Sequence, residues 1–420
     1  MKRWNDKLRY MELIEIDKQA HKMIVAWMLC RLVCRDKTQE ERVALEEQVV
    51  EGGIFDYLFR LVITDIKPPI LYRIKENPEH YLCLAKWAQA EAEPHLRPLG
   101  EDFWDRFVSS TNQPGRTGEA AEILDAAHAY SSAWEFRLIR PLNEPFDDEM
   151  PEIGQSFIRL LKKCEHLPGM NDLLLGLERL TPQWGKTVNS RCSSGAPAAA
   201  IPALARFANL CGQLRFQKRW SQTPRIPETS VMGHMFIVAC YAYFLSMQLG
   251  VCRARRVNNF FCGLFHDLPE LLTRDIISPV KKSFENLNLL IKEYEESELE
   301  RQIFAPLTRE GHKPIVERLR YYLGLETGSE FDDTIVENGV IRKVDFSALQ
   351  TKYTDDRFDP KDGEAIKICD ILAAYIEAYT AMRNGITSDQ IQQAFWRIRE
   401  HNAKRMLGSI HVGALFTDFD

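Results

Sequence analysis

Apolar residues recur at steps of three and four along almost the whole chain, and this spacing limits the fold more than any other feature. Such spacing gives each helix an apolar stripe that must be buried against other helices. The sequence therefore predicts an all-α protein. The segments that carry the pattern are 21–34, 54–63, 120–138, 157–164, 203–216, 234–249, 257–272, 285–304, 366–382 and 389–406.

Strand-like alternation is limited to one short stretch. Residues 334–343 alternate in polarity around Asn338-Gly339, a pair that favours a two-residue hairpin turn. The stretch lies inside residues 323–363, which are rich in Gly and Asp and have the character of an insertion. We expect a small β-hairpin near 330–345 within an otherwise helical domain.

The chain length of 420 residues favours two domains over one. Small residues, glycine and proline gather at 185–202, a composition typical of a linker or an exposed loop. We expect a helical domain at 1–184, a linker at 185–202 and a second domain at 203–420.

Bulk composition excludes some partners. The net charge of -6 gives no electrostatic footprint for duplex nucleic acid. The apolar run 235–247 is too short to span a membrane, and we interpret it as a buried core helix. The N-terminus has no apolar signal segment, and the ten cysteines lack zinc-ribbon spacing. These features predict a cytoplasmic protein with reduced thiols and no membrane partner.

A His266-Asp267 pair follows an apolar stretch and places two different metal ligands side by side. Two further candidates, His234 and Asp370, lie on apolar segments upstream and downstream. Together they could bind one divalent metal ion, with Co, Mn, Fe, Ni, Zn and Mg not distinguishable. Asp345 also precedes an apolar stretch and is the alternative fourth ligand. Only His312 lies between the pair and Asp370, which favours a single metal over two.

Glu270 is the candidate catalytic acid–base group. It follows His266 by four residues and Asp267 by three, so the three would share one face of a helix. Pro269 interrupts this helix unless it lies in the first turn. A carboxylate beside a metal can deprotonate a water molecule and later protonate a leaving oxygen. The alternative is a solvated helix residue.

The ligand pattern resembles the H…HD…D signature of the HD-domain metal-dependent phosphohydrolase superfamily. Arg219-Trp220 stands before the first ligand, and His266 to Lys281 is similar to a block found in the bacterial 5'-deoxynucleotidase branch. The resemblance implies that His234, His266, Asp267 and Asp370 bind the metal, with Asp267 and Glu270 in the catalytic centre. Arg219 would bind the phosphate and Trp220 would cover the sugar or base. The residues implied to line the sugar pocket are Asp275, Ile276, Ile277 and Ser278.

The implied activity is the removal of phosphate from a (deoxy)nucleoside 5'-monophosphate. Gly233 stands where the family usually has Glu before the first ligand, and residues 323–363 have no obvious counterpart, which puts the substrate in doubt. The alternatives are a nucleoside-triphosphate hydrolase, a cyclic-nucleotide phosphodiesterase, and a nucleotide-sensing module without turnover. A small-molecule nucleotide is the expected partner in each case.

A weak internal repeat relates the two halves. His21 parallels His234, and Asp56-Tyr57 parallels the His-Asp pair. Asp125 parallels Asp370, and Lys2-Arg3-Trp4 parallels Lys218-Arg219-Trp220. We expect two tandem HD-like bundles, of which the first is degenerate, packed as an intramolecular pseudo-dimer that could form further homo-oligomers. The alternative is two unrelated helical domains, in which His21 and His128 are core residues.

Overall fold

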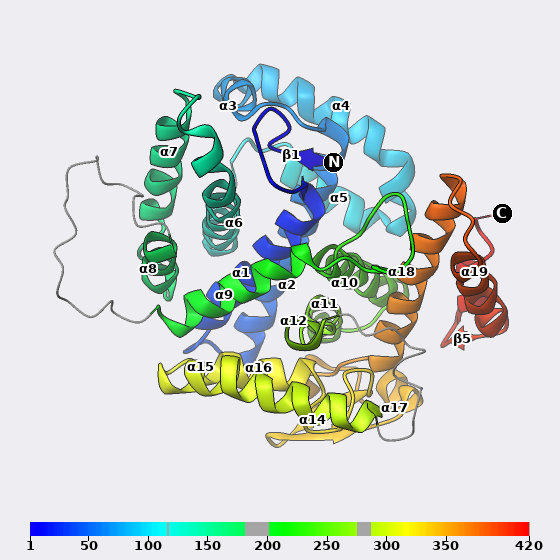
Figure 1. Ribbon diagram of the computed structural model, residues 1–420. Helices are drawn as coiled ribbons and strands as arrows, with labels where there is room; N and C mark the ends of the chain where they lie inside the picture. Colours follow the sequence, from blue (N-terminus) through cyan, green and yellow to red (C-terminus); the bar gives the residue numbers. More distant parts are fainter. Residues whose placement is uncertain (116, 181–200, 275–286, 420) are drawn as a thin grey trace. The chain divides into compact units, whose positions relative to one another are not determined.

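The computed structural model describes residues 1–115, 117–180, 201–274 and 287–419, and helices dominate them (Figure 1). The predicted all-α class is confirmed. Contacts between Cα atoms divide the chain into two compact units, Met1–Asn209 and Leu210–Asp420. Most of the predicted linker, 185–200, lies outside the described residues, so the domain limits 1–184 and 203–420 stay predictions.

The N-terminal unit is built around one buried helix, α1 (Glu15–Val33), which packs against α2 and α6. Its residues from Ala20 to Cys30 are fully or almost fully buried on every face, as expected of a core helix. Two short strands, β1 (Lys2–Arg3) and β2 (Leu13–Ile14), pair antiparallel just before it. The other elements are α2 (Gln39–Ile63), α3 (Pro68–Glu76), α4 (Pro78–Leu96), η1 (Arg97–Leu99), α5 (Glu101–Thr111), α6 (Glu119–Asn143), α7 (Met150–Lys163), α8 (Met170–Leu180) and α9 (Ala203–Gln213), which crosses the unit boundary.

The C-terminal unit is likewise built around a core helix, α10 (Val231–Gln248), which packs against α11 and α18. In Figure 1, α18 (orange) runs beside α19 (red), a contact that the packing confirms. η2 (Leu214–Phe216) precedes α10, and the strands β5 (Met406–Leu407) and β6 (Ile410–His411) pair near the end of the chain. The helices after α10 are α11 (Arg253–Phe265), α12 (Glu270–Thr273), α14 (Leu287–Leu299), η3 (Glu300–Phe304), α15 (Ala305–Arg309), α16 (Lys313–Tyr322), α17 (Phe346–Thr351), η4 (Asp356–Phe358), α18 (Gly363–Arg383), α19 (Asp389–Asn402) and α20 (Val412–Leu415).

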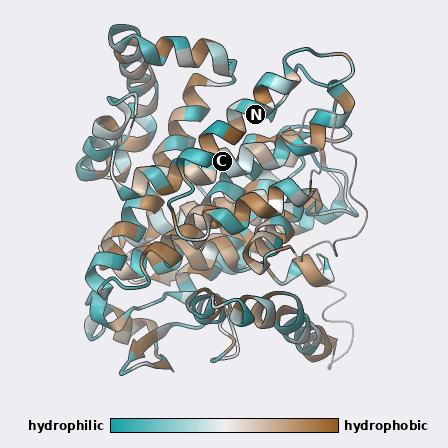
Figure 2. Ribbon diagram, turned by 90° about the vertical axis from the view of Figure 1, so that its left-hand side faces the viewer, coloured by the Kyte–Doolittle hydropathy of each residue, from teal (hydrophilic) through white to brown (hydrophobic). Residues whose placement is uncertain are grey.

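Most helices are amphipathic, and Figure 2 shows teal and brown residues interleaved along them. The two core helices are exceptions, because α1 is buried on every face and 13 of the 18 residues of α10 are buried. By length and composition α10 is the one helix among the described residues that could span a bilayer, yet 72% of the window is buried in the protein. The helix expected at 235–247 is therefore a core helix.

The predicted hairpin is confirmed. Strands β3 (Thr334–Glu337) and β4 (Val340–Lys343) pair antiparallel, with Glu337 opposite Val340. Asn338 and Gly339 form the turn with φ angles of 53° and 76°. A tight turn of this hand needs positive φ at both central residues, which Asn and Gly adopt most readily.

The start of α18 is held by buried polar contacts. Asp362 caps the helix by accepting a hydrogen bond from the Ala365 amide at 3.0 Å, and it accepts another from Arg255 Nη2 at 2.6 Å. Asn259 Oδ1 accepts from the Asp362 amide at 2.8 Å. Since Arg255 and Asn259 lie on α11, these contacts fix α18 relative to α11.

A second carboxylate, Asp333, is buried beside this cap and accepts a hydrogen bond from the Glu364 amide at 3.0 Å. Burial first, and then the charge of Asp362, raise the pKa of Asp333 from 3.8 to about 7. A carboxyl whose pKa is higher in the folded state stabilises the fold fully below its unfolded pKa. That contribution is lost as the pH rises through about 7.

We therefore expect Asp333→Asn to stabilise the protein in a pH-dependent way. The amide oxygen can still accept from Glu364, but no charge is buried beside Asp362. At about pH 8 the variant should exceed the wild type by on the order of 1–3 kcal/mol in free energy of unfolding, and near pH 5 the difference should almost vanish. Urea denaturation at both pH values measures it, and an equal difference at both would contradict the assignment.

Candidate metal centre

The four predicted ligands converge in the C-terminal unit. His234 Nε2 lies 3.2 Å from Asp370 Oδ1 and 3.7 Å from Asp267 Oδ2. His266 Nε2 lies 3.2 Å from Asp267 Oδ2 and 4.0 Å from Asp370 Oδ1. Three separate parts of the chain therefore bring two imidazoles and two carboxylates together, and each imidazole lies within 4.0 Å of both carboxylates.

Local contacts set the direction of these side chains. His266 follows the last residue of α11, and its Nδ1 makes a 2.8 Å hydrogen bond with the Gly263 carbonyl, which turns Nε2 toward the other ligands. Ser230 caps α10 by accepting from the Gly233 amide at 2.8 Å, which places His234 at the end of the first turn. A bonded Nδ1 that orients the opposite nitrogen is typical of histidine ligands.

The close approach of α10 and α11 depends on a glycine. A Cβ atom on Gly263 would lie 2.9 Å from Ala239 Cα, a backbone contact that no side chain can relieve by moving. Glycine therefore lets α11 approach α10 closely enough for His266 to reach His234.

The donor set fits a divalent metal ion. His234 Nε2 and His266 Nε2 are buried polar atoms without a hydrogen-bond partner among the described residues. The candidate ligand atoms of His234, His266 and Asp267 all lie within 4.8 Å of one another. Bonds of about 2.0–2.2 Å to one ion imply ligand separations of roughly 3–4 Å. A bound cation would complete the coordination that these nitrogen atoms lack.

The electrostatics of the cluster also favour a cation. Burial opposes ionisation of Asp267, but the neighbouring imidazoles and Arg219 outweigh it and hold its pKa below the ordinary range. The pKa of Asp370 is also held well below its usual value, because burial is outweighed by His234 and Lys367. Burial lowers the pKa of His266, yet the two carboxylates raise it to about 9. The carboxylates therefore stay ionised and attract positive charge.

Arg219 and Trp220 lie at the edge of the cluster. Arg219 Nη1 is 3.4 Å from Asp267 Oδ2, and its Nε donates to Glu377 Oε2 at 3.3 Å. Trp220 Nε1 donates to the same Glu377 oxygen at 2.8 Å. Nη2 of Arg219 makes no hydrogen bond within the described residues, and the side chain is 14% exposed. The guanidinium can therefore still bind an anion beside the metal ligands.

Glu377 is a site residue that the sequence reasoning missed. Besides Arg219 and Trp220, it accepts from Thr229 Oγ1 at 2.6 Å and lies 3.9 Å from His234 Nδ1. Burial raises its pKa, but Arg219 and His234 lower it to about 2. It follows Asp370 by seven residues, which is two helical turns and the same face. That spacing is the signal that could have identified it.

Glu270 lines the same cavity as His266 and Asp267, but the expected continuous helix is wrong. α11 ends at Phe265, and a turn stabilised by the Glu270 amide donating to the Asp267 carbonyl at 3.1 Å leads into α12. The cavity has a volume of about 120 Å³. Its lining residues are His266, Asp267, Pro269, Glu270, Lys292, Glu295, Glu296, Leu299, Leu323, Leu325 and Glu330.

The remaining predicted residues divide into three groups. Asp345 caps α17 by accepting from the Ala348 amide at 2.7 Å, which favours Asp370 as the fourth ligand. His312 is buried, but it is not part of the His/Asp group. The predicted sugar-pocket residues lie outside the described residues: Asp275, Ile276, Ile277 and Ser278.

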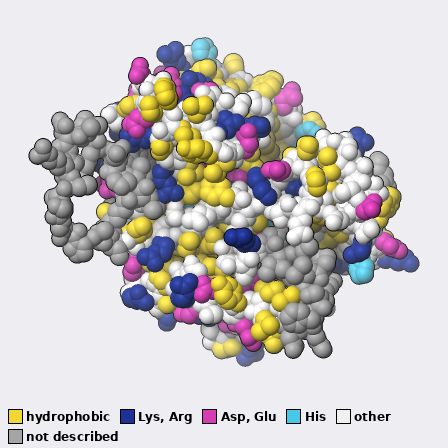
Figure 3. Space-filling view, in the orientation of Figure 1, with side chains coloured by type: hydrophobic (Ala, Val, Ile, Leu, Met, Phe, Trp, Pro, Cys, Tyr) yellow, Lys and Arg dark blue, Asp and Glu magenta, His cyan; other side chains and the backbone are white. Residues whose placement is uncertain are grey.

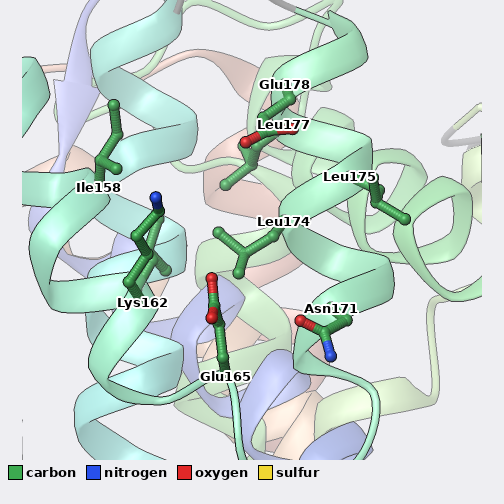
Figure 4. A pocket seen from close by; sticks show the side chains of 9 residues that line it. Ile158, Lys162, Glu165, Asn171, Leu174, Leu175, Leu177 and Glu178 are labelled. Atoms are coloured by element: carbon green, nitrogen blue, oxygen red, sulfur yellow. The ribbon is translucent and has the colours of Figure 1, made fainter. Parts of the chain in front are cut away.

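A larger cavity of about 340 Å³ lies between α7 and α8 of the N-terminal unit (Figure 4). Its lining is a mixture of aliphatic side chains with Lys162, Glu165, Asn171 and Glu178. Its described lining residues include no histidine or cysteine, so cavity size does not identify the candidate metal centre.

Comparison with known proteins supports the centre. Residues 211–399 match the family model of the HD domain, a span that includes every predicted ligand. HD domains are in general metal-dependent hydrolases. Neither the curated proteins nor the solved structures gave a match.

Metal affinity should depend on pH. Binding needs the neutral His266 imidazole, whose pKa is about 9 without metal. Between about pH 6 and 9 we expect Mn²⁺ affinity to rise by up to tenfold per pH unit, with about one proton released per ion. Isothermal titration calorimetry in buffers of different ionisation enthalpy measures both quantities. An affinity that is flat across this range would be inconsistent with His266 as a ligand.

Glu377→Gln should destabilise the C-terminal unit. The amide keeps a hydrogen-bond acceptor for Trp220 but removes one of the two carboxylates beside Arg219, which keeps Asp267, and the buried carboxylate 3.9 Å from Arg225. We expect a loss on the order of 1–3 kcal/mol in free energy of unfolding. Glu228→Gln is the control, because that carboxylate is 70% exposed. Equal stability of the two variants would show that the buried pair contributes little.

Proposed function

We propose that the C-terminal unit is a metal-dependent phosphohydrolase that removes phosphate from a (deoxy)nucleoside 5'-monophosphate. The observation that carries this proposal is the convergence of His234, His266, Asp267 and Asp370 beside an arginine with an unused guanidinium edge. The HD-domain match of residues 211–399 supports a metal-dependent phosphohydrolase in general. The nucleotide substrate rests on the resemblance of the Arg219-Trp220 and His266–Lys281 motifs.

Arg219 would bind and orient the phosphate. Glu377 and Asp267 hold its guanidinium at two nitrogen atoms, and the remaining edge can donate charge-assisted hydrogen bonds to phosphate oxygens. Because these two contacts already order the Arg219 side chain, it loses less conformational entropy when the substrate binds. Trp220, held by the same Glu377, would lie against the sugar or base.

A divalent cation, when bound, would polarise a phosphoryl oxygen and make a water molecule easier to deprotonate. Glu270 lines the cavity beside His266 and Asp267, so its carboxylate can accept a proton from the attacking water. The same group can then return the proton to the leaving oxygen. Asp267 both serves as a ligand and holds Arg219, which links metal binding to phosphate binding.

The cavity itself repels an anion in the absence of metal. Among the described residues, five carboxylates line it, from Asp267, Glu270, Glu295, Glu296 and Glu330, against the ammonium of Lys292 and the imidazole of His266, which is protonated at neutral pH without metal. A phosphate ester would enter favourably only after a cation offsets this charge. We therefore expect strict metal dependence.

The proposed substrate is a small molecule and not duplex nucleic acid. The net charge of -6 supports this, as does the face in Figure 3, where basic and acidic side chains are interspersed over the described residues. The 120 Å³ cavity has room for a phosphate group and waters but is smaller than typical pockets for whole ligands of about 300–1,000 Å³.

Phosphate release from a nucleotide panel in the presence of Mn²⁺ or Co²⁺ tests the proposal. Release of inorganic phosphate from monophosphates is expected; pyrophosphate or triphosphate release would favour a triphosphate hydrolase, and opening of cyclic nucleotides a phosphodiesterase. No turnover of any nucleotide, with nucleotide binding retained, would favour a sensing module.

Three variants assign the roles. His266→Ala should lose both metal and activity. Glu270→Gln should keep the metal and lose activity by about 100-fold or more, because only proton transfer is removed. Glu317→Gln, at an exposed carboxylate of α16, is the control and should keep both. Full activity of Glu270→Gln would remove that residue from the mechanism.

A further inference from the structure

Each unit begins with the same local structure. In the N-terminal unit Lys2 pairs with Ile14, and in the C-terminal unit Lys218 pairs with Ser230. The tryptophan that follows has φ of 54° at Trp4 and 57° at Trp220, a left-handed conformation that is uncommon for a bulky residue. A rare backbone conformation at matching places indicates a shared local fold.

In both units the Arg-Trp pair binds one buried glutamate. Arg3 Nε donates to Glu135 Oε2 at 2.7 Å, and Trp4 Nε1 donates to the same oxygen at 3.1 Å. This repeats the contacts of Arg219 and Trp220 with Glu377. Glu135 is therefore the structural equivalent of Glu377 in the N-terminal unit. The comparison of the two sequence halves did not identify this pair.

These anchors correct the expected alignment of the repeat. Counting four residues from Ser230 and from Ile14 places Lys18, not His21, at the position of His234. Counting seven residues back from each glutamate places His128, not Asp125, at the position of Asp370. His21 instead bonds the Ala208 carbonyl at 2.9 Å in the core.

The contacts confirm the new alignment. Lys18 Nζ lies 2.7 Å from His128 Nδ1, just as His234 Nε2 lies 3.2 Å from Asp370 Oδ1. His128 is exposed, although the sequence predicted a core residue. His128 therefore lies at the surface of the N-terminal unit, whereas Lys18 beside it is buried.

The second helix keeps the alignment that the sequence suggested. Thr64 and Arg274 are the C-caps of α2 and α12, with φ of 58° and 64°. Counting back from them places Asp56, Tyr57 and Arg60 at the positions of His266, Asp267 and Glu270. Asp56 forms an ion pair with the buried Lys22.

The two clusters differ in the basic group at one position. The C-terminal cluster combines Arg219, Arg225 and Lys367 with the carboxylates of Asp267, Glu270, Asp370 and Glu377. The N-terminal cluster combines Arg3, Lys18, Lys22 and Arg60 with the carboxylates of Glu15, Asp56, Asp65 and Glu135. The amine of Lys18 therefore stands where the C-terminal cluster has the imidazole of His234.

Lys18 differs from the other basic side chains of the N-terminal cluster. Within the described residues its ammonium has only the neutral imidazole of His128 as a hydrogen-bond partner and forms no ion pair. Burial is the main cause that holds the pKa of Lys18 well below its ordinary value, so the charged form would gain from a nearby anion. Arg3, at the place of Arg219, has the same 14% side-chain exposure.

We propose that the N-terminal unit binds a phosphate-bearing anion without metal, between Lys18, His128 and Arg3. The Lys18 ammonium supplies the positive charge that a metal ion would supply in the C-terminal unit. Tyr57 and Arg60 stand where the metal centre has Asp267 and Glu270, so the carboxylate proposed to activate water has no counterpart at that position. The site would therefore bind its ligand and not hydrolyse it.

The test compares two substitutions at the exposed His128. His128→Glu gives Lys18 a carboxylate partner, whereas His128→Gln is similar in size and neutral. Both are made in the full chain with Asp267→Ala and a chelator, so that the metal centre does not contribute. Inorganic phosphate and 5'-dAMP are titrated separately by calorimetry, which distinguishes free phosphate from a nucleotide as the ligand.

We expect binding of at least one probe by the parent and by His128→Gln, and at least about tenfold weaker binding by His128→Glu. Lys18→Met should abolish binding, and Lys86→Met, at an exposed lysine of α4, should not. Absence of binding by the parent, or equal binding by the Glu and Gln variants, would overturn the proposal. Because turnover is not measured, failure here and failure of the hydrolase proposal remain separate results.

Discussion

The candidate metal centre depends on the packing of α10 against α11. His234 and His266 lie on different helices, and their imidazoles meet because Gly263 has no side chain to hold the helices apart. The third helix, α18, is fixed to α11 by the buried contacts of Asp362 with Arg255 and Asn259. The ligand geometry therefore rests on apolar packing and one buried polar network, neither of which includes a ligand.

Much of this was predictable from the sequence, for identifiable reasons. Helical spacing of apolar residues predicted the all-α fold, and Asn338-Gly339 predicted the hairpin, because both are local properties. The ligands could be recognised by type, since His and Asp on apolar segments need a partner. Glu377 was missed because a buried glutamate has no local signature, and its role comes from residues more than a hundred positions away.

The proposed repeat of the two units illustrates a limit of aligning them by residue type alone. His21 and His234 are the same residue type in similar apolar surroundings, yet strand pairing puts Lys18 at the equivalent place. Position in the fold is set by backbone contacts, and side chains at equivalent positions are free to change. The contacts that persist in both units are those of Arg, Trp and Glu, which stabilise the start of each unit whether or not a metal can bind.

One helix carries two different parts of the proposed chemistry. Asp370 and Glu377 lie on the same face of α18, about 10 Å apart along its axis at 1.5 Å per residue. Asp370 faces His234, and Glu377 accepts hydrogen bonds from the guanidinium of Arg219 and the indole of Trp220. A tilt or translation of α18 would displace Asp370 and Glu377 together. A conformational change elsewhere in the unit that moves α18 would therefore alter metal affinity and anion binding at the same time.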